Sequence, residues 1–230
     1  MNLKGLQGDA VLARDGEIGP VRDAYFDDER WALRYLVVEA EHWMPRRTVL
    51  ISPASIEREG TDAHTLRIAL TCNEVKRGPD ADTRKPVSRQ YEMAHARHFG
   101  YPYYWLGPDL WGNSQVPMSV AAARRQGASP LRDLQEHAAE EREAADSHLR
   151  SSAEVIGYAI EAADGPIGHV EDFLVDENTW AVSGMIVDTR NWLPGGKVVL
   201  PPSAVAGIDW QQKKVKVRLT REEVKRSRNL

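Results

Sequence analysis

The sequence predicts an all-β dominated fold: two small antiparallel β-barrels with a partly helical joining segment. The chain repeats itself without a gap at a constant offset of 149 residues, from Gly8/Gly157 to Lys76/Lys225. Each copy holds short β-forming runs separated by turn residues, and the segment between the copies resembles neither of them. Two copies of this size suit two small domains better than a solenoid. The expected units are a first barrel over 1–77, a joining segment over 78–150 and a second barrel over 151–230.

Composition and charge limit the class of protein. The chain has 230 residues, of which 42% are hydrophobic, as is ordinary for one or two globular domains. Its net charge of −4 argues against a general nucleic-acid binder. We expect neither a secretory signal nor a membrane-spanning helix, because the chain lacks the apolar runs that these need. Cys72 is the single cysteine, so no intrachain disulfide can form, and we expect a cytoplasmic protein.

The first copy is expected to form strands and a short helix. The strands are rich in β-branched, aromatic and alternating apolar residues, and turn residues separate them. They are expected at Ala10–Arg14, Ile18–Asp27, Trp31–Ala40, Thr48–Ile51 and Leu66–Leu70. Pro20 cannot donate a backbone hydrogen bond and therefore belongs at an edge or a bulge. Thr71 to Lys76 is expected to form one or two helical turns.

The second copy predicts the same elements with cleaner alternation. Its strands are expected at Val155–Ala163, Ile167–Asp176, Trp180–Thr189, Lys197–Leu200 and Val215–Leu219, the last pairing with Ile208–Trp210. Barrels with fewer than about eight strands leave no room for a ligand, so side chains such as Val170, Val187 and Val198 should fill each interior. A binding site is then expected on a surface, in a loop or between the barrels.

The joining segment combines helices with an aromatic stretch. Ser88 can cap a helix that runs to His98, and Ser129-Pro130 can begin another that runs from Leu131 to about Asp146. Between them, the stretch from Phe99 to Trp111 holds six of the chain's 17 aromatic residues. Such a stretch either packs between the barrels or forms a recognition patch. The candidate partner-binding residues here are Tyr103, Tyr104, Trp105 and Trp111.

Three repeated phrases resemble the PRC-barrel family. They are Asp-Gly-x-Ile-Gly-x-Val-x-Asp at 15–23 and 164–172, Asp-x-x-x-Trp-Ala at 27–32 and 176–181, and Val-x-x-x-x-Trp-x-Pro-x-x-x-Val at 38–49 and 187–198. The short motifs of the joining segment at 85–90 and 101–105 resemble those of bacterial proteins with tandem PRC-barrels. The family includes the cytoplasmic domain of the photosynthetic reaction centre H subunit and the C-terminal domain of a ribosome maturation factor. The resemblance implies a non-enzymatic docking module with an unknown protein partner, and it supplies no catalytic residues and no cofactor.

Two tryptophans at loop tips are further candidates for partner binding. Trp43 and Trp192 occupy equivalent positions in the two copies, each close to a proline. An indole there either covers an end of the barrel or anchors a partner, because it supplies much apolar area at little entropic cost. The edge strands and these tryptophans could also pair two copies of the chain as a homodimer.

The C-terminus is a basic strip. Between Lys213 and Arg228 the chain holds eight basic and two acidic residues, whereas Glu154 to Asp209 holds nine acidic and two basic. One interpretation is the solvent face of an edge strand, where lysine discourages edge pairing. The alternative is a surface for an acidic partner or an anionic membrane, which would make the chain a peripheral membrane protein. The candidate residues for that surface are Lys213, Lys214, Lys216 and Arg218.

No catalytic or metal site is expected. Glu92, His95 and His98 recur every three residues on a predicted helix, but this spacing spreads them around it, so we favour solvated side chains over a metal site. The repeated carboxylates Asp23/Asp172 and Asp27/Asp176 are better explained as caps of turns and strand ends than as a carboxylate site. Cys72 is expected to be inert.

Overall fold

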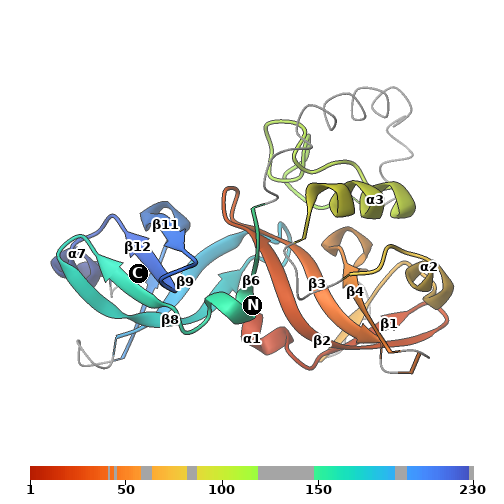
Figure 1. The fold of residues 1–230 in the computed structure, drawn as a ribbon, viewed down its shortest axis with the longest axis horizontal. Coiled ribbons are helices and arrows are strands. Elements are labelled where there is room, and N and C mark those ends of the chain that lie inside the picture. Colours follow the sequence, from red (N-terminus) through yellow and green to blue (C-terminus); the bar gives the residue numbers. More distant parts are fainter. Residues whose placement is uncertain are drawn as a thin grey trace.

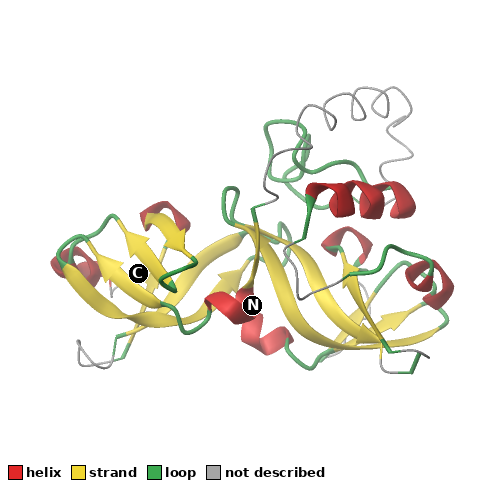
Figure 2. Cartoon of the chain, in the orientation of Figure 1, coloured by secondary structure: helices red, strands yellow, loops and turns green. Residues whose placement is uncertain are grey.

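The structure is a computed structural model of the 230-residue chain. It describes residues 1–40, 42–43, 46–57, 64–81, 87–118, 148–189 and 196–227. Two six-stranded sheets dominate it, with short helices at their margins (Figures 1 and 2). The predicted β-dominated class is therefore confirmed. The helix expected from Leu131 to Asp146 lies outside the described residues, and no described helix is long and apolar enough to cross a membrane.

The first sheet contains the strands of the first repeat in the order β4-β3-β2-β1-β5, and β6 pairs with β2 beside this path. Its elements are α1 (Leu3–Leu6), β1 (Ala10–Ala13), β2 (Gly16–Asp27), β3 (Ala32–Ala40), β4 (Arg47–Ile51), η1 (Pro53–Ser55), β5 (Thr65–Arg67), α2 (Cys72–Lys76) and β6 (Leu149–Ser151). All pairs are antiparallel except β1 with β5. The register between β1 and β2 shifts at Ile18, whereas Pro20, expected at an edge or a bulge, pairs in register with Ala10.

The second sheet has the order β10-β9-β8-β7-β12-β11, and only β12 and β7 are parallel. Its elements are α6 (Ser152–Val155), β7 (Ala159–Ala162), β8 (Gly165–Val175), β9 (Val182–Asp188), β10 (Lys197–Leu200), η2 (Pro202–Ala204), β11 (Val205–Asp209), β12 (Lys214–Val217) and α7 (Arg221–Arg226). Among the described strands, neither path closes on itself.

The beginning of the second repeat differs from the sequence prediction. The strand expected from Val155 begins only at Ala159, because the preceding residues form helix α6. The Ser151 hydroxyl caps that helix by accepting from the backbone N–H of Glu154 at 3.0 Å. A capping residue thus outweighs the β-propensity of the run that follows it.

The repeated sequence motif has a local structural cause. Asp15 and Asp164 accept hydrogen bonds from the first backbone N–H groups of α2 and α7, at 2.6 and 2.7 Å. Gly168 has a φ of +139°, and a Cβ there would lie 1.8 Å from the carbonyl oxygen of Asp188 on the neighbouring chain segment. Only glycine permits that close approach. The motif therefore specifies a tight turn, a close strand crossing and a helix cap.

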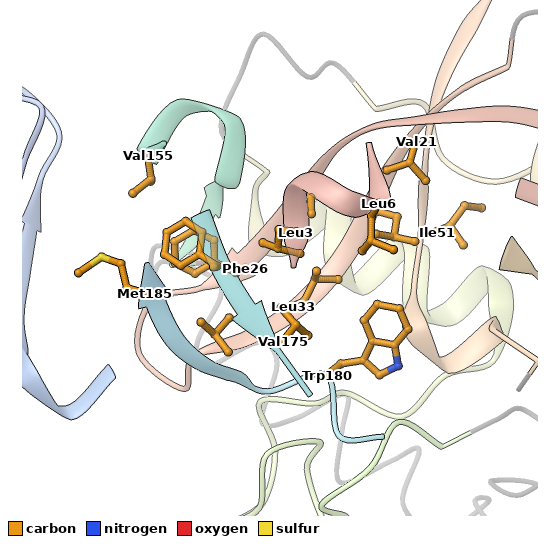
Figure 3. Packing of buried hydrophobic residues seen from close by; sticks show 14 of the residues in the cluster. Leu3, Leu6, Val21, Phe26, Leu33, Ile51, Val155, Val175, Trp180 and Met185 are labelled. Atoms are coloured by element: carbon orange, nitrogen blue, oxygen red, sulfur yellow. The ribbon is translucent and has the colours of Figure 1, made fainter. Parts of the chain in front are cut away.

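The two repeats share one hydrophobic core. Phe26 and Phe173 are both fully buried, and their ring centroids lie 5.1 Å apart across the junction of the two sheets. Figure 3 shows Leu3 and Leu33 of the first repeat beside Val175 of the second. A single cluster of buried side chains extends through both repeats, so the two units are packed as one body.

Equivalent residues of the two repeats bind each other across that junction. The Leu33 backbone N–H donates to the Trp180 carbonyl at 2.8 Å, and the Val182 N–H donates to the Trp31 carbonyl at 2.7 Å. Leu33 corresponds to Val182, and Trp31 to Trp180, at the repeat offset. Both tryptophans adopt left-handed backbone conformations, with φ of 52° and 58°. Each repeat thus donates and accepts the same hydrogen bond, as the two subunits of a two-fold symmetric dimer do, although both repeats belong to one chain.

The repeats also exchange their first helices. The Lys4 N–H at α1 donates to Asp172 of β8 at 3.1 Å, and the Ala153 N–H at α6 donates to Asp23 of β2 at 3.0 Å. Figure 1 shows α1 at the junction of the two lobes. Each repeat is therefore completed by an arm of the other.

Candidate functional site

The joining segment lies against the outer face of the first sheet. Its helix α3 (Arg89–Phe99) begins at Ser88, whose hydroxyl accepts from the Tyr91 N–H at 3.2 Å, as the sequence predicted. Figure 1 shows α3 beside β3 and β4. The sheet residues beneath it, which we call the covered face, are Tyr25, Tyr35, Val37 and Leu50, and each is at most 6% exposed.

A histidine attaches α3 to the edge strand of this sheet. His95 Nε2 lies 2.9 Å from the carbonyl oxygen of Leu50, so this nitrogen carries the proton, and the ring meets Tyr35 edge-on at 5.0 Å. Burial lowers the pKa of His95 to about 4. The imidazole is therefore neutral at physiological pH and serves as a structural donor.

Two arginines of the first repeat hold the aromatic stretch. Arg30 donates to four backbone carbonyls, those of Tyr104, Trp105, Gly107 and Asp109. Arg34 is 1% exposed and donates to the Leu110 carbonyl at 2.7 Å and to Asp27 Oδ2 at 3.0 Å. Its guanidinium lies 3.9 Å from the centroid of the Tyr104 ring and 4.7 Å from that of Trp111. Because this arginine is buried, stacks on two aromatic rings and donates to the backbone of the segment, it fixes the segment's position.

A buried carboxyl group completes this network. Glu92 is fully buried, its Oε2 lies 2.8 Å from Arg89 Nη1, and its Oε1 accepts from the Tyr104 hydroxyl. Burial raises the pKa of Glu92 to about 8, and Arg89 offsets this effect only in part. The same burial raises the pKa of the Tyr104 hydroxyl. The raised pKa values favour the protonated forms of Glu92 and Tyr104 at neutral pH. Hydrogen bonds among Arg89, Glu92 and Tyr104 therefore hold the segment together with the charge of Arg89.

A small cavity lies within the docked segment. Its volume is about 20 Å³, and Arg34, His95, Tyr104 and Trp111 are among the residues that line it. Arg34 Nε and His95 Nδ1 are buried there without a hydrogen-bond partner among the described residues. About 10–15 Å³ is enough for one water molecule, so this cavity has the size of a water site and not of a substrate site.

The second sheet carries the equivalent outer face, with no helix across it among the described residues. Its apolar residues, which we call the open face, are Leu174, Ile186 and Val199. They correspond to Tyr25, Val37 and Leu50 of the covered face. Val199 is 38% exposed, against 2% for Leu50.

The two faces also differ at one bulge. Arg34 and Ser183 are the extra residues where β3 and β9 shift register against their neighbours. Ser183 is exposed and donates to the Leu174 carbonyl at 3.2 Å, whereas Arg34 reaches into the joining segment. The covered face thus has Arg34 at the position where the open face has Ser183.

Most of the predicted partner-binding aromatics lie in the core. Tyr103, Tyr104, Trp105 and Trp111 are each at most 7% exposed, and Trp111 Nε1 donates to the Thr179 carbonyl of the second repeat at 2.7 Å. In this conformation a partner could contact little of these side chains. Their role in binding remains a prediction.

The predicted loop-tip tryptophans have different outcomes. Trp43 is half-buried against the core cluster, which suits the interpretation that it covers an end of the fold. Trp192 lies outside the described residues. Pairing of two chains through these tips stays a prediction.

The basic strip is spread over a strand and its neighbouring turn. Lys214 Nζ lies 3.6 Å from Glu161, and Lys216 Nζ lies 3.8 Å from Asp209. Arg218 donates to the carbonyl of Ser203 at 2.9 Å, and Lys213 sits in the turn with a φ of 52°. The side chains of Lys214 and Lys216 are 39% and 54% exposed, but β12 lies between β7 and β11, so the edge-strand interpretation is wrong.

The expectation that Glu92 and His95 are solvated is wrong, because they are 0% and 2% exposed under the docked segment, and the remaining polar candidates also have structural partners. His98 Nε2 contacts the Glu74 carbonyl at 2.9 Å, and the described residues contain no cluster of three metal-ligating side chains. Asp27 Oδ1 accepts two backbone N–H groups of its turn, and Asp176 Oδ1 accepts the equivalent pair, so both carboxylates cap turns as expected. Partial burial raises the pKa of the Cys72 thiol, which keeps it protonated.

Sequence reasoning missed the arginines that hold the joining segment. Arg34 interrupts the otherwise apolar run from Ala32 to Val38, and at the repeat offset the second copy has Ser183 in its place. A charge within an apolar strand in one copy alone signals a contact that the other copy lacks. Comparison of the two copies could have found Arg34, but not the carbonyls that it binds.

The chain matches no protein-family model, and no curated protein matches it significantly.

Proposed function

We propose that this chain is a non-enzymatic docking module, built of two PRC-type barrels, that binds another protein through its surface. The observation that carries the proposal is the open face. It is an apolar sheet surface whose counterpart in the same molecule is covered by a helix. Apolar surfaces of this kind mark interaction sites in soluble proteins.

The filled interiors support the same proposal. Ile18 in the first repeat, and Ile167 and Val187 in the second, are completely buried, and Phe26 is buried against Phe173 of the other repeat. The repeated carboxylates are occupied in capping turns and helices. Each sheet contains one parallel pair, β1 with β5 and β12 with β7, at equivalent places in the two repeats. A rigid body of this kind suits presentation of a surface.

Membrane attachment through the basic strip is the rival proposal. In its favour is the charge of the C-terminal segment. Against it, Lys214 and Lys216 have acidic neighbours and Arg218 binds backbone carbonyls. We therefore prefer a protein partner in the cytoplasm.

The test is affinity capture with the full chain as bait. Native lysate is separated into soluble and detergent-solubilised membrane fractions, and each is passed over the wild type and a Trp43→Ala/Trp192→Ala variant. We expect one defined protein to be retained in stoichiometric amount from one fraction, and its loss in the variant would locate the contact at the loop tips. Recovery of the bait alone from both fractions contradicts the proposal.

A further inference from the structure

The covered face of the first sheet indicates what the open face of the second can bind. In the first repeat, α3 crosses the strands and places its Tyr91 and His95 rings over the apolar residues. A hydrogen bond to the carbonyl of Leu50 then fixes the helix at the edge strand. The equivalent strands of the second repeat, β9 and β10, pair in the same antiparallel register as β3 and β4.

The shape of the open face suits an aliphatic helix surface. Gly184 stands where the first repeat has Tyr35, and a Cβ at Gly184 would lie 2.5 Å from Val199 Cγ1. Val199 therefore occupies the space above Gly184 that a larger side chain would fill. The resulting surface of Leu174, Ile186 and Val199 is low and apolar, without the ring that contacts His95 in the first repeat.

Charge indicates the chemistry of the partner. In the first repeat Arg34 binds Asp27 Oδ2, whereas at the equivalent positions the second repeat has Ser183 and Asp176. Asp176 is exposed, and no described arginine or lysine pairs with it. Glu177 beside it is exposed as well, so two carboxylates face solvent at this corner and a basic partner is favoured.

We infer that the open face binds a basic amphipathic α-helix of a partner protein. Its apolar side lies on Leu174, Ile186 and Val199, and an arginine or lysine at its flank reaches Asp176. This inference rests on the proposed docking function and names the partner's chemistry. The helix α3 of a second copy is not the occupant, because its Glu92 and His95 are already buried against its own first repeat.

The test uses the full chain and a labelled synthetic helix. The probe has about 16 residues, with leucines at i, i+3, i+4 and i+7 and arginines at the flanks. A peptide of the same composition in scrambled order is the control. We expect saturable binding of the ordered peptide by fluorescence anisotropy, with amide chemical-shift changes centred on Leu174, Ile186 and Val199.

Two variants locate the contact. Val199→Asp is expected to weaken binding at least tenfold, whereas Val116→Asp, which alters a valine of matching exposure (39% against 38%) elsewhere on the surface, leaves binding unchanged. Ser183→Arg should supply Asp176 with a cation from the chain itself, so it weakens binding and flattens its salt dependence. Equal binding of the scrambled peptide, or no effect of Val199→Asp, overturns the inference.

The captured natural partner separates this inference from the docking proposal. Loss of that partner in Val199→Asp, but not in Val116→Asp, supports both. Full retention by both variants keeps the docking function and overturns the assignment to the open face. Failure of capture by the wild type, together with failure of the ordered peptide to bind, contradicts both.

Discussion

The two repeats share five strands in the same register but have different outer surfaces. In the first, Leu50 lies under α3 and is 2% exposed, and in the second the equivalent Val199 is 38% exposed. The covering comes from the joining segment, which follows the first repeat once and crosses its face. The comparison teaches that a duplicated sheet can keep its core and its mutual interface while its outer faces diverge.

The largest expected effect comes from making the first repeat resemble the second. Arg34→Ser removes a fully buried cation between Asp27, the Leu110 carbonyl and two aromatic rings. Because this leaves a buried carboxylate without its partner, the free energy of unfolding should fall by about 3–5 kcal/mol. Urea denaturation measures this change. The control Arg22→Ala, which breaks a surface pair with Glu39 at 2.9 Å, should cost less than about 1 kcal/mol. Equal costs for the two variants would show that the segment is held by other contacts.

The docked segment should also give the protein a pH dependence that the second repeat lacks. The pKa of Glu92 is raised to about 8, so the folded state binds a proton that the unfolded state has released, and stability falls as pH rises toward 8. His95 has the opposite sign: its pKa is lowered to about 4, so its contribution is lost as pH falls below 6.5. Between pH 6.5 and 8 only the effect of Glu92 changes, and it amounts to about 2 kcal/mol at most.

Denaturation at several pH values tests this prediction. The wild type should lose stability from pH 6.5 to 8, and Glu92→Gln, which keeps the shape and a hydrogen-bonding amide, should abolish that slope. If the free energy of unfolding of Glu92→Gln still falls from pH 6.5 to 8, a group other than Glu92 causes the pH dependence.

The exchanged arms provide a smaller contrast. Asp23 accepts from the hydroxyls of Ser151 and Ser152 and from the Ala153 N–H, whereas across the junction Asp172 accepts from Lys4 N–H. Asp23→Ala should therefore cost about 1–2 kcal/mol and Asp172→Ala about 0.5–1 kcal/mol. Thermal unfolding of the two variants ranks them, and the reverse order would mean that the first arm, α1, contributes more than the second.

The smallest effect is expected at the basic strip. Replacing Lys213, Lys214 and Lys216 together with alanine should change the free energy of unfolding by less than about 1 kcal/mol, because these are exposed groups.

The same variant tests the membrane proposal by sedimentation with vesicles that contain anionic lipid. We expect no salt-sensitive binding of the wild type. Binding that disappears both with salt and in the variant would favour membrane attachment.

Periodicity predicted the local structure well. The alternating runs identified most strands, and Thr71 and Ser88 correctly marked the starts of α2 and α3. The helix α6 was missed because Val155 continues an apolar run that looks like a strand. Short capped helices of this kind are decided by a few hydrogen bonds, which periodicity does not detect.

The contacts between the repeats could not be predicted. The left-handed conformation of Trp31 and Trp180 is rare outside glycine, and no local signal marks it. The exchange of α1 and α6 likewise depends on tertiary packing of Asp23 and Asp172, which the sequence suggested only as caps. The candidate open face needed the structure, because Val199 alternates in β10 like any outward residue of an edge strand.

The exchanged first arm bears on how the chain is made. The Lys4 N–H binds Asp172, which is 168 residues further along, and Leu3 and Leu6 are only 4% and 5% exposed in the finished fold. At about 5–20 residues per second, the ribosome needs roughly 10–30 s to reach that point. During that time α1 leaves the exit tunnel without its partner on β8. The first arm must wait for the second repeat before it can dock, so the nascent chain is exposed to chaperones or to premature contacts until that repeat has been made.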